Sequence, residues 1–361
     1  MTSPHGGNDL IGDVHDVANL SNHAACMRTA TWSSTLRWGG YPLVLVVLGL
    51  RVPISRRRVQ GGSWPREPGT DRDTGGAVES VEVGGVRIAF ERLGTGDPVV
   101  LVGGTGMPPV AWELCGLRDA LVAAGFEVVT YAARGVAPSD APPAPYTMAD
   151  LTDDLAGLLD ALGIAQAAVV GYSLGSFTAE LLARNRPDLV RSVVLMAGTG
   201  PLNGVLDAVL RTEAELIALT GRIPPAYAAA QTLLSTLPPH VLTTDEAQVR
   251  AWIELLGAQE DVWASTEGEV GQSAASDGWA RDPGRMAALT RIRVPALVVA
   301  FEHDMLFPPS SGRTAADALP LGEFALISGA AHGGLLTSPT ETITAVRAFL
   351  SRTTLGGGRS R

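Results

Sequence analysis

From Val78 onward, short apolar runs alternate with longer stretches in which apolar residues recur every three or four positions. Apolar runs of about four to eight residues bounded by glycine or proline indicate buried strands, and the longer period indicates amphipathic helices. The predicted strands are Val81–Val83 and Val86–Phe90 (a hairpin about Gly84-Gly85), Pro98–Val102, Glu127–Tyr131, Ala167–Gly171, Val190–Ala197, Ala296–Ala300 and Glu323–Ile327. The predicted helices are Trp112–Ala124, Thr147–Leu162 (with Asp150 completing a capping box), Leu174–Arg186, Ser311–Leu319 and Thr340–Ser351. This alternation predicts an α/β fold whose mostly parallel sheet carries helices on both faces.

The alternation stops between about Pro201 and Arg285, where the pattern is helical and is broken at Pro224-Pro225 and Pro238-Pro239. An interruption of about 85 residues is too long for a connecting loop. We therefore expect an inserted helical cap at 201–285. It would divide an α/β core made of residues 78–200 and 286–353, with a flexible tail at 354–361.

The first 77 residues show neither period, and glycine, proline, serine and arginine are scattered through them. Their one apolar run, Tyr41 to Leu50, is too short to span a bilayer. It also lies too far from the start, and ends in arginines, unlike a secretory signal. We expect a disordered or loosely attached extension of a cytoplasmic protein. A true start near Val78 and membrane association through residues 41–50 are the alternatives.

Composition narrows the chemistry. All 27 basic side chains are arginine, which excludes mechanisms that need a lysine, such as Schiff-base catalysis or a P-loop. Two cysteines cannot build a cysteine-rich metal site, and a net charge of −10 disfavours nucleic acid and anionic membranes as partners. We expect a small-molecule substrate, with no cofactor and no metal.

The segment Gly171-Tyr172-Ser173-Leu174-Gly175 lies where a predicted buried strand turns directly into a predicted helix. A Gly-x-Ser-x-Gly turn of this kind exposes its serine above the sheet, at the N-terminus of a helix, where developing negative charge is favoured. The pattern predicts that Ser173 is a nucleophile, and a plain glycine turn is the alternative.

A serine nucleophile needs a base and an orienting carboxylate. His332 follows the last predicted strand in a loop of small residues, and Asp304 follows the strand Ala296–Ala300, so both lie at the edge of the sheet that carries Ser173. Glu302 competes with Asp304 for the carboxylate role. We interpret His303 as a surface or supporting residue and His240 as a surface loop residue.

With the order Ser, acid, His, the chain from about 79 to 351 resembles the α/β-hydrolase superfamily. Ala132-Ala133-Arg134-Gly135 through Ser139 is similar to that family's Arg-Gly-x-Gly-x-Ser loop, with Ala137 in place of the second glycine. The resemblance implies the triad Ser173, Asp304 and His332.

The resemblance also implies an oxyanion hole made by the backbone N–H groups of Thr105 and Leu174. Relatives commonly carry His-Gly-x where this chain has Gly103-Gly104-Thr105, so the histidine that braces the loop is replaced by Gly103. The same loop could instead cradle a dinucleotide phosphate, but Pro109 occupies the third glycine position of that pattern.

Residues 201–285 carry 12 acidic and 5 basic side chains, which disfavours polyanionic substrates. We therefore expect hydrolysis of an ester, lactone or thioester of a neutral, largely apolar molecule through an acyl-enzyme. A lyase, a cyclase, a cofactor-free haloperoxidase-like enzyme and a non-catalytic binding protein remain alternatives on the same fold. Glu269 and Gln272 either point into the site or belong to a solvated cap loop.

Overall fold

The computed structural model describes residues 33–38, 41–46, 78–258 and 262–354, all within the unit Ser33–Arg361. Predictions for the rest of 1–77 and for 355–361 lie outside the described residues. Two strands of the first 77 residues are described, β1 (Ser33–Trp38) and β2 (Tyr41–Val46), and they pair antiparallel with Trp38 opposite Tyr41. This hairpin was not predicted, although Gly39-Gly40 between two aromatic residues is a typical hairpin signal.

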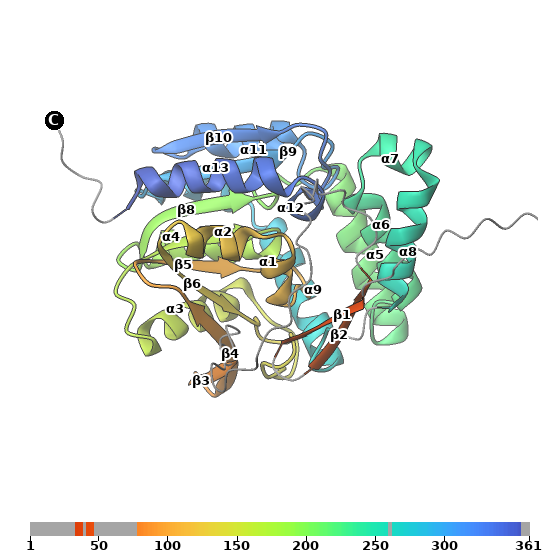
Figure 1. Cartoon of the computed structure of the whole chain (residues 1–361), viewed down its shortest axis with the longest axis horizontal. Helices are drawn as coiled ribbons and strands as arrows, with labels where there is room; N and C mark the ends of the chain where they lie inside the picture. The colour runs from red at the N-terminus through yellow and green to blue at the C-terminus, as the bar shows by residue number, and fades with distance from the viewer. Residues whose placement is uncertain (1–32, 39–40, 47–77, 259–261, 355–361) are drawn as a thin grey trace, which may run out of the picture. The chain divides into compact units, whose positions relative to one another are not determined.

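The core is an eight-stranded sheet (Figure 1). Its strands are β3 (Glu79–Val83), β4 (Val86–Leu93), β5 (Asp97–Val102), β6 (Phe126–Tyr131), β7 (Ala167–Tyr172), β8 (Val190–Met196), β9 (Ala296–Phe301) and β10 (Gly322–Ile327). Their spatial order is β10-β9-β8-β7-β5-β6-β4-β3, with β5 to β10 parallel and the β3–β4 hairpin antiparallel at one edge. The predicted α/β fold with a mostly parallel sheet is confirmed.

Helices cover both faces of this sheet. They are α1 (Val110–Leu114), α2 (Leu117–Ala123), α3 (Met148–Ala161), α4 (Leu174–Asn185), α11 (Pro309–Ala318) and α13 (Pro339–Arg352). Consecutive β5 residues enter opposite cores: Val100 belongs to the cluster with α3, α4 and α11, and Val99 to the cluster with α1, α2 and α13. Because a strand alternates its side chains, burial on both faces explains why β5 reads as a continuous apolar run.

Between Pro201 and Arg285 the chain forms five helices among the described residues, as the loss of alternation predicts. They are α5 (Gly204–Thr220), α6 (Pro225–Thr236), α7 (Pro239–Thr244), α8 (Glu246–Ala258) and α9 (Thr266–Ala280). The short helices α10 (Arg285–Ala288), η1 (Leu289–Arg291) and α12 (Gly334–Thr337) complete the described helices. Figure 1 shows α5, α6, α7 and α8 grouped together, with α9 running back toward the sheet.

Local signals succeed at one helix start and fail at another. Thr147 and Asp150 form the predicted capping box at the start of α3. The predicted helix Trp112–Ala124 is wrong as a single element, because Gly116 adopts a left-handed conformation (φ 76°) and separates α1 from α2. Glycine permits that conformation at little steric cost. The pattern of apolar residues continues through Gly116, so it does not indicate that the helix is broken there.

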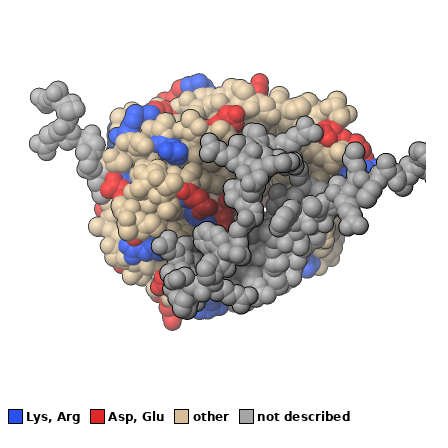
Figure 2. Space-filling model, in the orientation of Figure 1, with Lys and Arg blue, Asp and Glu red and all other residues tan. Residues whose placement is uncertain are grey.

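Surface charge contributes little to this fold. On the face drawn in Figure 2, acidic and basic side chains lie singly or in small mixed groups on a largely uncharged surface. Exposed pairs such as Arg352–Glu323 (2.6 Å) and Arg87–Asp140 (2.7 Å) contribute about 0–1 kcal/mol each. Within the described ranges, no helix is both long and apolar enough to cross a bilayer.

The close contact between α4 and β5 is a testable constraint. A Cβ at Gly175 would lie 2.0 Å from the carbonyl oxygen of Val102, whereas a Cβ at Gly278, exposed within α9, would meet nothing within 4 Å. Gly175→Ala should lower the free energy of unfolding by about 1–3 kcal/mol or more, because backbone must move. The matched Gly278→Ala should raise it by about 0.5–1 kcal/mol. Urea denaturation of both variants measures the difference, and equal midpoints would contradict the contact.

Candidate active site

Ser173 occupies the turn between β7 and α4 with φ 53° and ψ −120°. A positive φ is uncommon for a residue with a side chain and costs on the order of 1–3 kcal/mol. The flanking glycines allow the turn, since a Cβ at Gly171 would lie 2.2 Å from the carbonyl oxygen of Gly175. The predicted strand–turn–helix arrangement at Ser173 is therefore present.

The site lies at the point in the sheet where the order in which successive strands are added reverses. The chain passes from β5 to β6 on one side, then returns to β7 on the other side of β5. Crevices form at the carboxyl ends of parallel strands at such a point. The segments after β5, β7, β9 and β10 all emerge at that edge, and they carry Thr105, Ser173, Asp304 and His332 respectively.

The structure brings Ser173, His332 and Asp304 into one hydrogen-bonded chain. His332 Nε2 lies 3.2 Å from Ser173 Oγ, and His332 Nδ1 lies 2.8 Å from Asp304 Oδ2. The Asp304 side chain is fully buried and that of His332 is 12% exposed. Because a carboxylate only accepts, Nδ1 carries the proton and Nε2 presents its lone pair to the serine.

Backbone donors hold Asp304 in place. Its Oδ1 accepts hydrogen bonds from the N–H groups of Leu306 and Phe307, both at 2.9 Å, which leaves Oδ2 for His332. The competing carboxylate, Glu302, is exposed and accepts the N–H of Gly329 at 2.7 Å, at the start of the histidine loop. The geometry therefore brings Asp304, and not Glu302, to His332.

The other two histidines of the described chain lie apart from this hydrogen-bonded chain. His240 is exposed as predicted, but it belongs to helix α7 and not to a loop. Its ring lies 6.3 Å from the half-buried ring of His303, with the two rings edge to face. In the described part of the chain, no group of three or more His, Cys, Asp or Glu side chains is placed to hold a metal ion.

Contacts from two sides fix the backbone of His332. Its N–H donates to the carbonyl of Ser235 near the end of α6 (3.0 Å), and its carbonyl accepts from Tyr172 Oη (2.8 Å). Burial, together with the nearby Asp304, raises the pKa of the Tyr172 phenol, so it stays a donor. The Phe307 ring stacks on the imidazole at 5.7 Å. Sequence reasoning did not identify Tyr172, Phe307 or Ser235, because each acts through a contact distant in the chain.

The loop after β5 approaches the serine closely. A Cβ at Gly104 would lie 3.1 Å from Ser173 Cβ, so only glycine leaves this approach free. Within the described residues, neither the N–H of Thr105 nor that of Leu174 has a hydrogen-bond acceptor, whereas the N–H groups of Gly104 and Gly106 do. The two N–H groups named by the resemblance are thus the ones left for a ligand.

Glu269 and Gln272 lie in helix α9 and are buried, so the interpretation as a solvated cap loop is wrong. Glu269 Oε2 accepts the N–H of Ile223 at 3.1 Å. Gln272 Oε1 accepts the N–H of Gly106 at 2.9 Å, within the loop that also contains Thr105. The local sequence suggested a loop because α9 is rich in glycine and serine, and tertiary packing overrides that propensity.

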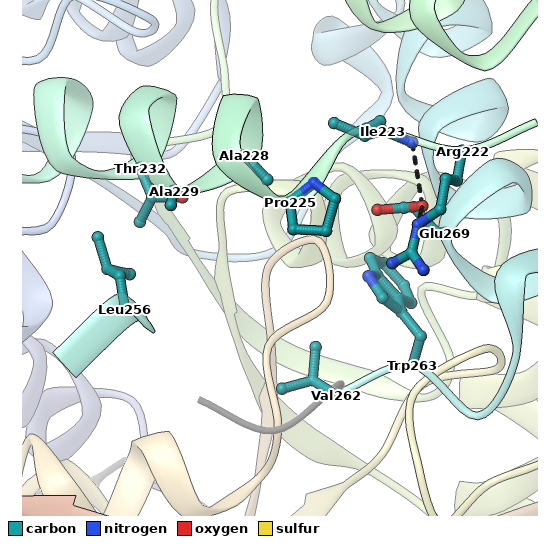
Figure 3. Close-up of a pocket in the computed structure, with 10 residues that line it drawn as sticks. All are labelled: Arg222, Ile223, Pro225, Ala228, Ala229, Thr232, Leu256, Val262, Trp263 and Glu269. Atoms are coloured by element: carbon teal, nitrogen blue, oxygen red, sulfur yellow. Dashed lines mark hydrogen bonds and ion pairs between the residues drawn. The ribbon is translucent and has the colours of Figure 1, made fainter. Parts of the chain in front are cut away.

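A cavity of about 310 Å³ lies beside that loop (Figure 3). Its walls are mostly apolar side chains of α6, α8 and the segment before α9, with Arg222 and Glu269 at one end (Arg222, Ile223, Pro225, Ala228, Ala229, Thr232, Leu256, Val262, Trp263 and Glu269). Trp263 connects the cavity to the loop, since a Cβ at Gly106 would lie 2.8 Å from its ring. A cavity of this size can hold a small molecule.

Known proteins share this fold and much of this sequence. "Putative non-heme bromoperoxidase BpoC" of Mycobacterium tuberculosis is 34% identical over 268 residues, covering 74% of this chain and 98% of that protein. Its crystal structure superposes with a TM-score of 0.67 at 33% identity, covering 74% and 96% of the two chains.

Two further relatives have hydrolase names. "Putative carbamate hydrolase RutD" of Pantoea ananatis is 30% identical over 254 residues, covering 70% of this chain and 88% of that protein. The structure of a thermophilic esterase from Thermogutta terrifontis has a TM-score of 0.64 at 25% identity, covering 76% and 99%. The family model described as the alpha/beta hydrolase fold matches residues 97–339. The chain therefore belongs to the α/β-hydrolase family.

Proposed function

We propose that this chain is a serine-dependent hydrolase that cleaves an ester, lactone or thioester of a neutral, largely apolar small molecule. The observation that carries the proposal is the hydrogen-bonded chain from Ser173 Oγ through His332 to Asp304. Serine is a weak nucleophile until an adjacent base removes its proton, and here the base lies within reach and is oriented by a buried carboxylate.

In the proposed reaction, His332 Nε2 takes the proton of Ser173 as Oγ attacks the substrate carbonyl carbon. The N–H groups of Thr105 and Leu174 stabilise the oxyanion, and Asp304 stabilises the imidazolium. His332 then protonates the leaving alcohol, thiol or lactone oxygen, leaving an acyl group on Ser173. Water, deprotonated by His332, attacks the acyl-enzyme and releases the carboxylic acid.

The cavity beside the oxyanion loop is the candidate site for the acyl group of the substrate. Alanine, isoleucine, leucine, valine and tryptophan side chains make up most of its wall. Its two charged side chains form an ion pair, with Arg222 Nε 3.7 Å from Glu269 Oε2. Because the two charges offset each other, the cavity favours neither anionic nor cationic substrates.

A second candidate activity is acyl transfer to hydrogen peroxide, which is supported by the 34% identity to a protein named a putative non-heme bromoperoxidase. Peroxide would replace water in the second step, so that acyl-Ser173 and H2O2 give a peracid and free serine. The peracid would then oxidise bromide outside the site, giving hypobromous acid and the carboxylate. Both candidates share the acyl-enzyme and differ only in its acceptor.

Triad substitutions test the shared first step. Ser173→Ala should lower kcat for p-nitrophenyl esters by about 10^4-fold or more, because triad members act as a unit. Asp304→Asn should cost about 10^4-fold, since the histidine then loses its orienting acceptor. Glu302→Gln should stay within about tenfold of wild type, because its oxygen can still accept the Gly329 N–H. A larger loss at Glu302 than at Asp304 would overturn the carboxylate assignment, and an active Ser173→Ala would overturn the nucleophile.

The acceptor is tested by partition of the acyl group. The enzyme is given an ester substrate, hydrogen peroxide and bromide, and a dione that is brominated by hypobromous acid reports on peracid formation. A hydrolase should release carboxylate as the main product and brominate the dione only slowly. Peracid release faster than carboxylate release would make perhydrolysis the main activity. Ser173→Ala is the control, because it should abolish both products.

Cavity filling tests the substrate site. Ala229→Leu, in the cavity wall on α6, should lower kcat/KM for long acyl chains by about tenfold relative to acetyl esters, because added methyl groups occupy space that the chain would fill. Ala230→Leu is the matched control, since that neighbouring residue is exposed and does not line the cavity. An unchanged chain-length profile in Ala229→Leu would exclude this cavity as the acyl site.

A further inference from the structure

The loop after β5 is built almost entirely from small residues. Gly103, Gly104 and Gly106 surround Thr105, whose N–H is assigned to the oxyanion hole, and Thr105 is exposed. Within the loop itself, the N–H of Met107 donates to the carbonyl of Gly104 at 3.1 Å, and the N–H of Gly104 points to Met107 Sδ at 3.4 Å. Glycine backbone is conformationally permissive, so this loop needs support from outside to hold an N–H in one direction.

That support comes from Gln272, which lies 166 residues further along the chain. Its amide oxygen accepts the N–H of Gly106 at 2.9 Å, and its amide nitrogen donates to the carbonyl of Arg134, also at 2.9 Å. The side chain is completely buried. Both ends of the amide are therefore satisfied, and they connect the loop after β5 to the loop after β6.

Both partners are backbone groups of fixed polarity. Gly106 presents a donor and Arg134 presents an acceptor, so only a side chain that accepts at one atom and donates at the other satisfies both. A carboxylate accepts at both oxygens and cannot donate to Arg134, whereas a protonated carboxyl can. The pair of contacts thus fits a neutral amide or a protonated carboxyl and excludes a carboxylate.

The far end of this connection is itself fixed. The Arg134 guanidinium donates to both oxygens of the buried Asp154 on α3, at 2.6 and 2.7 Å, a two-bond geometry that holds a side chain firmly. On the loop side, the Trp263 ring packs on Gly106, which has φ 62°. Gln272 consequently bridges two backbone segments, of which one carries the Arg134–Asp154 pair and the other packs against Trp263.

We propose that Gln272 is a positioning residue that fixes the oxyanion loop, and so directs the Thr105 N–H, from the cap helix α9. This inference rests on the proposed function. In it, Gln272, a side chain of the cap, supports the loop after β5 from outside. The N–H of Thr105 is adjacent to the braced N–H of Gly106, so rotation of one peptide displaces the other. A donor displaced by about 1 Å can cost up to about 100-fold in rate.

Three variants test this. Gln272→Met keeps the length and removes both hydrogen bonds, Gln272→Glu keeps the shape and one acceptor, and Ser276→Ala changes a buried polar residue one turn further along α9. Gln272→Met should lower kcat for p-nitrophenyl esters by about 10- to 100-fold with KM changed less than about threefold, because the loop acts on the transition state. Ser276→Ala should retain wild-type kcat.

The pH dependence of kcat in Gln272→Glu separates a positioning role from a merely structural one. Burial beside the Arg134 carbonyl should raise the pKa of the introduced carboxyl above its usual range, and only its protonated form can donate to that carbonyl. The ratio of variant to wild-type kcat should therefore rise as pH falls from about 8 to about 5.5, because groups common to both proteins affect both rates alike. The elements packed around this position carry further charged groups. They include Arg134 in the loop after β6, Asp150, Asp153 and Asp154 on α3, Asp207, Arg211, Glu213 and Glu215 on α5, and Glu267, Glu269 and Asp277 on α9.

Ser173→Ala, assayed in parallel, separates this inference from the proposed function. If wild-type turnover does not depend on Ser173, the proposed function fails. If it does, and Gln272→Met matches Ser276→Ala in kcat, the positioning role is overturned. A variant-to-wild-type ratio for Gln272→Glu that is flat with pH would overturn it equally. Because that variant is nearly isosteric, it decides the question even where Gln272→Met fails to fold.

Discussion

The close approach of three strand ends around Ser173 is the constraint on which the site depends. A Cβ at Gly104 would press on the serine side chain, one at Gly198 would lie 2.2 Å from its carbonyl oxygen, and one at Gly175 would strike the end of β5. Such contacts are possible only without side chains, and they hold Ser173 at its positive φ. The strain is stored in the backbone, where sheet hydrogen bonds and buried packing on both faces of the sheet offset it.

The helices between Pro201 and Arg285 contact both halves of the site. Helix α6 accepts the N–H of His332 through Ser235, and Thr236 lies against Gly333, where a Cβ would come within 2.2 Å. Helix α9 and the segment before it reach the oxyanion loop through Gln272 and Trp263. The loop that carries His332 and the loop after β5 are thus each contacted by residues between Pro201 and Arg285.

Much of the site could be predicted because its signals are local. The turn at Ser173 is specified by glycines two residues away on either side, the strands by short apolar runs, and the start of α3 by a side chain three residues from its cap. The parallel topology then follows from the alternation of strands and helices, and it brings Asp304 and His332 to the same edge. The split at Gly116 was missed because the apolar period continues across it, and the hairpin β1–β2 was missed although Gly39-Gly40 is a typical hairpin signal.

The sequence by itself determined the fold family and the serine turn, since the strands, the helices and the turn each depend on neighbours within a few residues. Only the tertiary structure decided between Asp304 and Glu302, which stand two residues apart with similar chemistry. The N–H groups of Leu306 and Phe307 hold Asp304 facing His332, while the N–H of Gly329 takes Glu302. Only the tertiary structure gave Gln272 its contacts, because its partners lie 138 and 166 residues away and no period in the chain relates them. Hydrogen bonds over such separations are set by how helices and strands pack, and that packing is a property of the whole core.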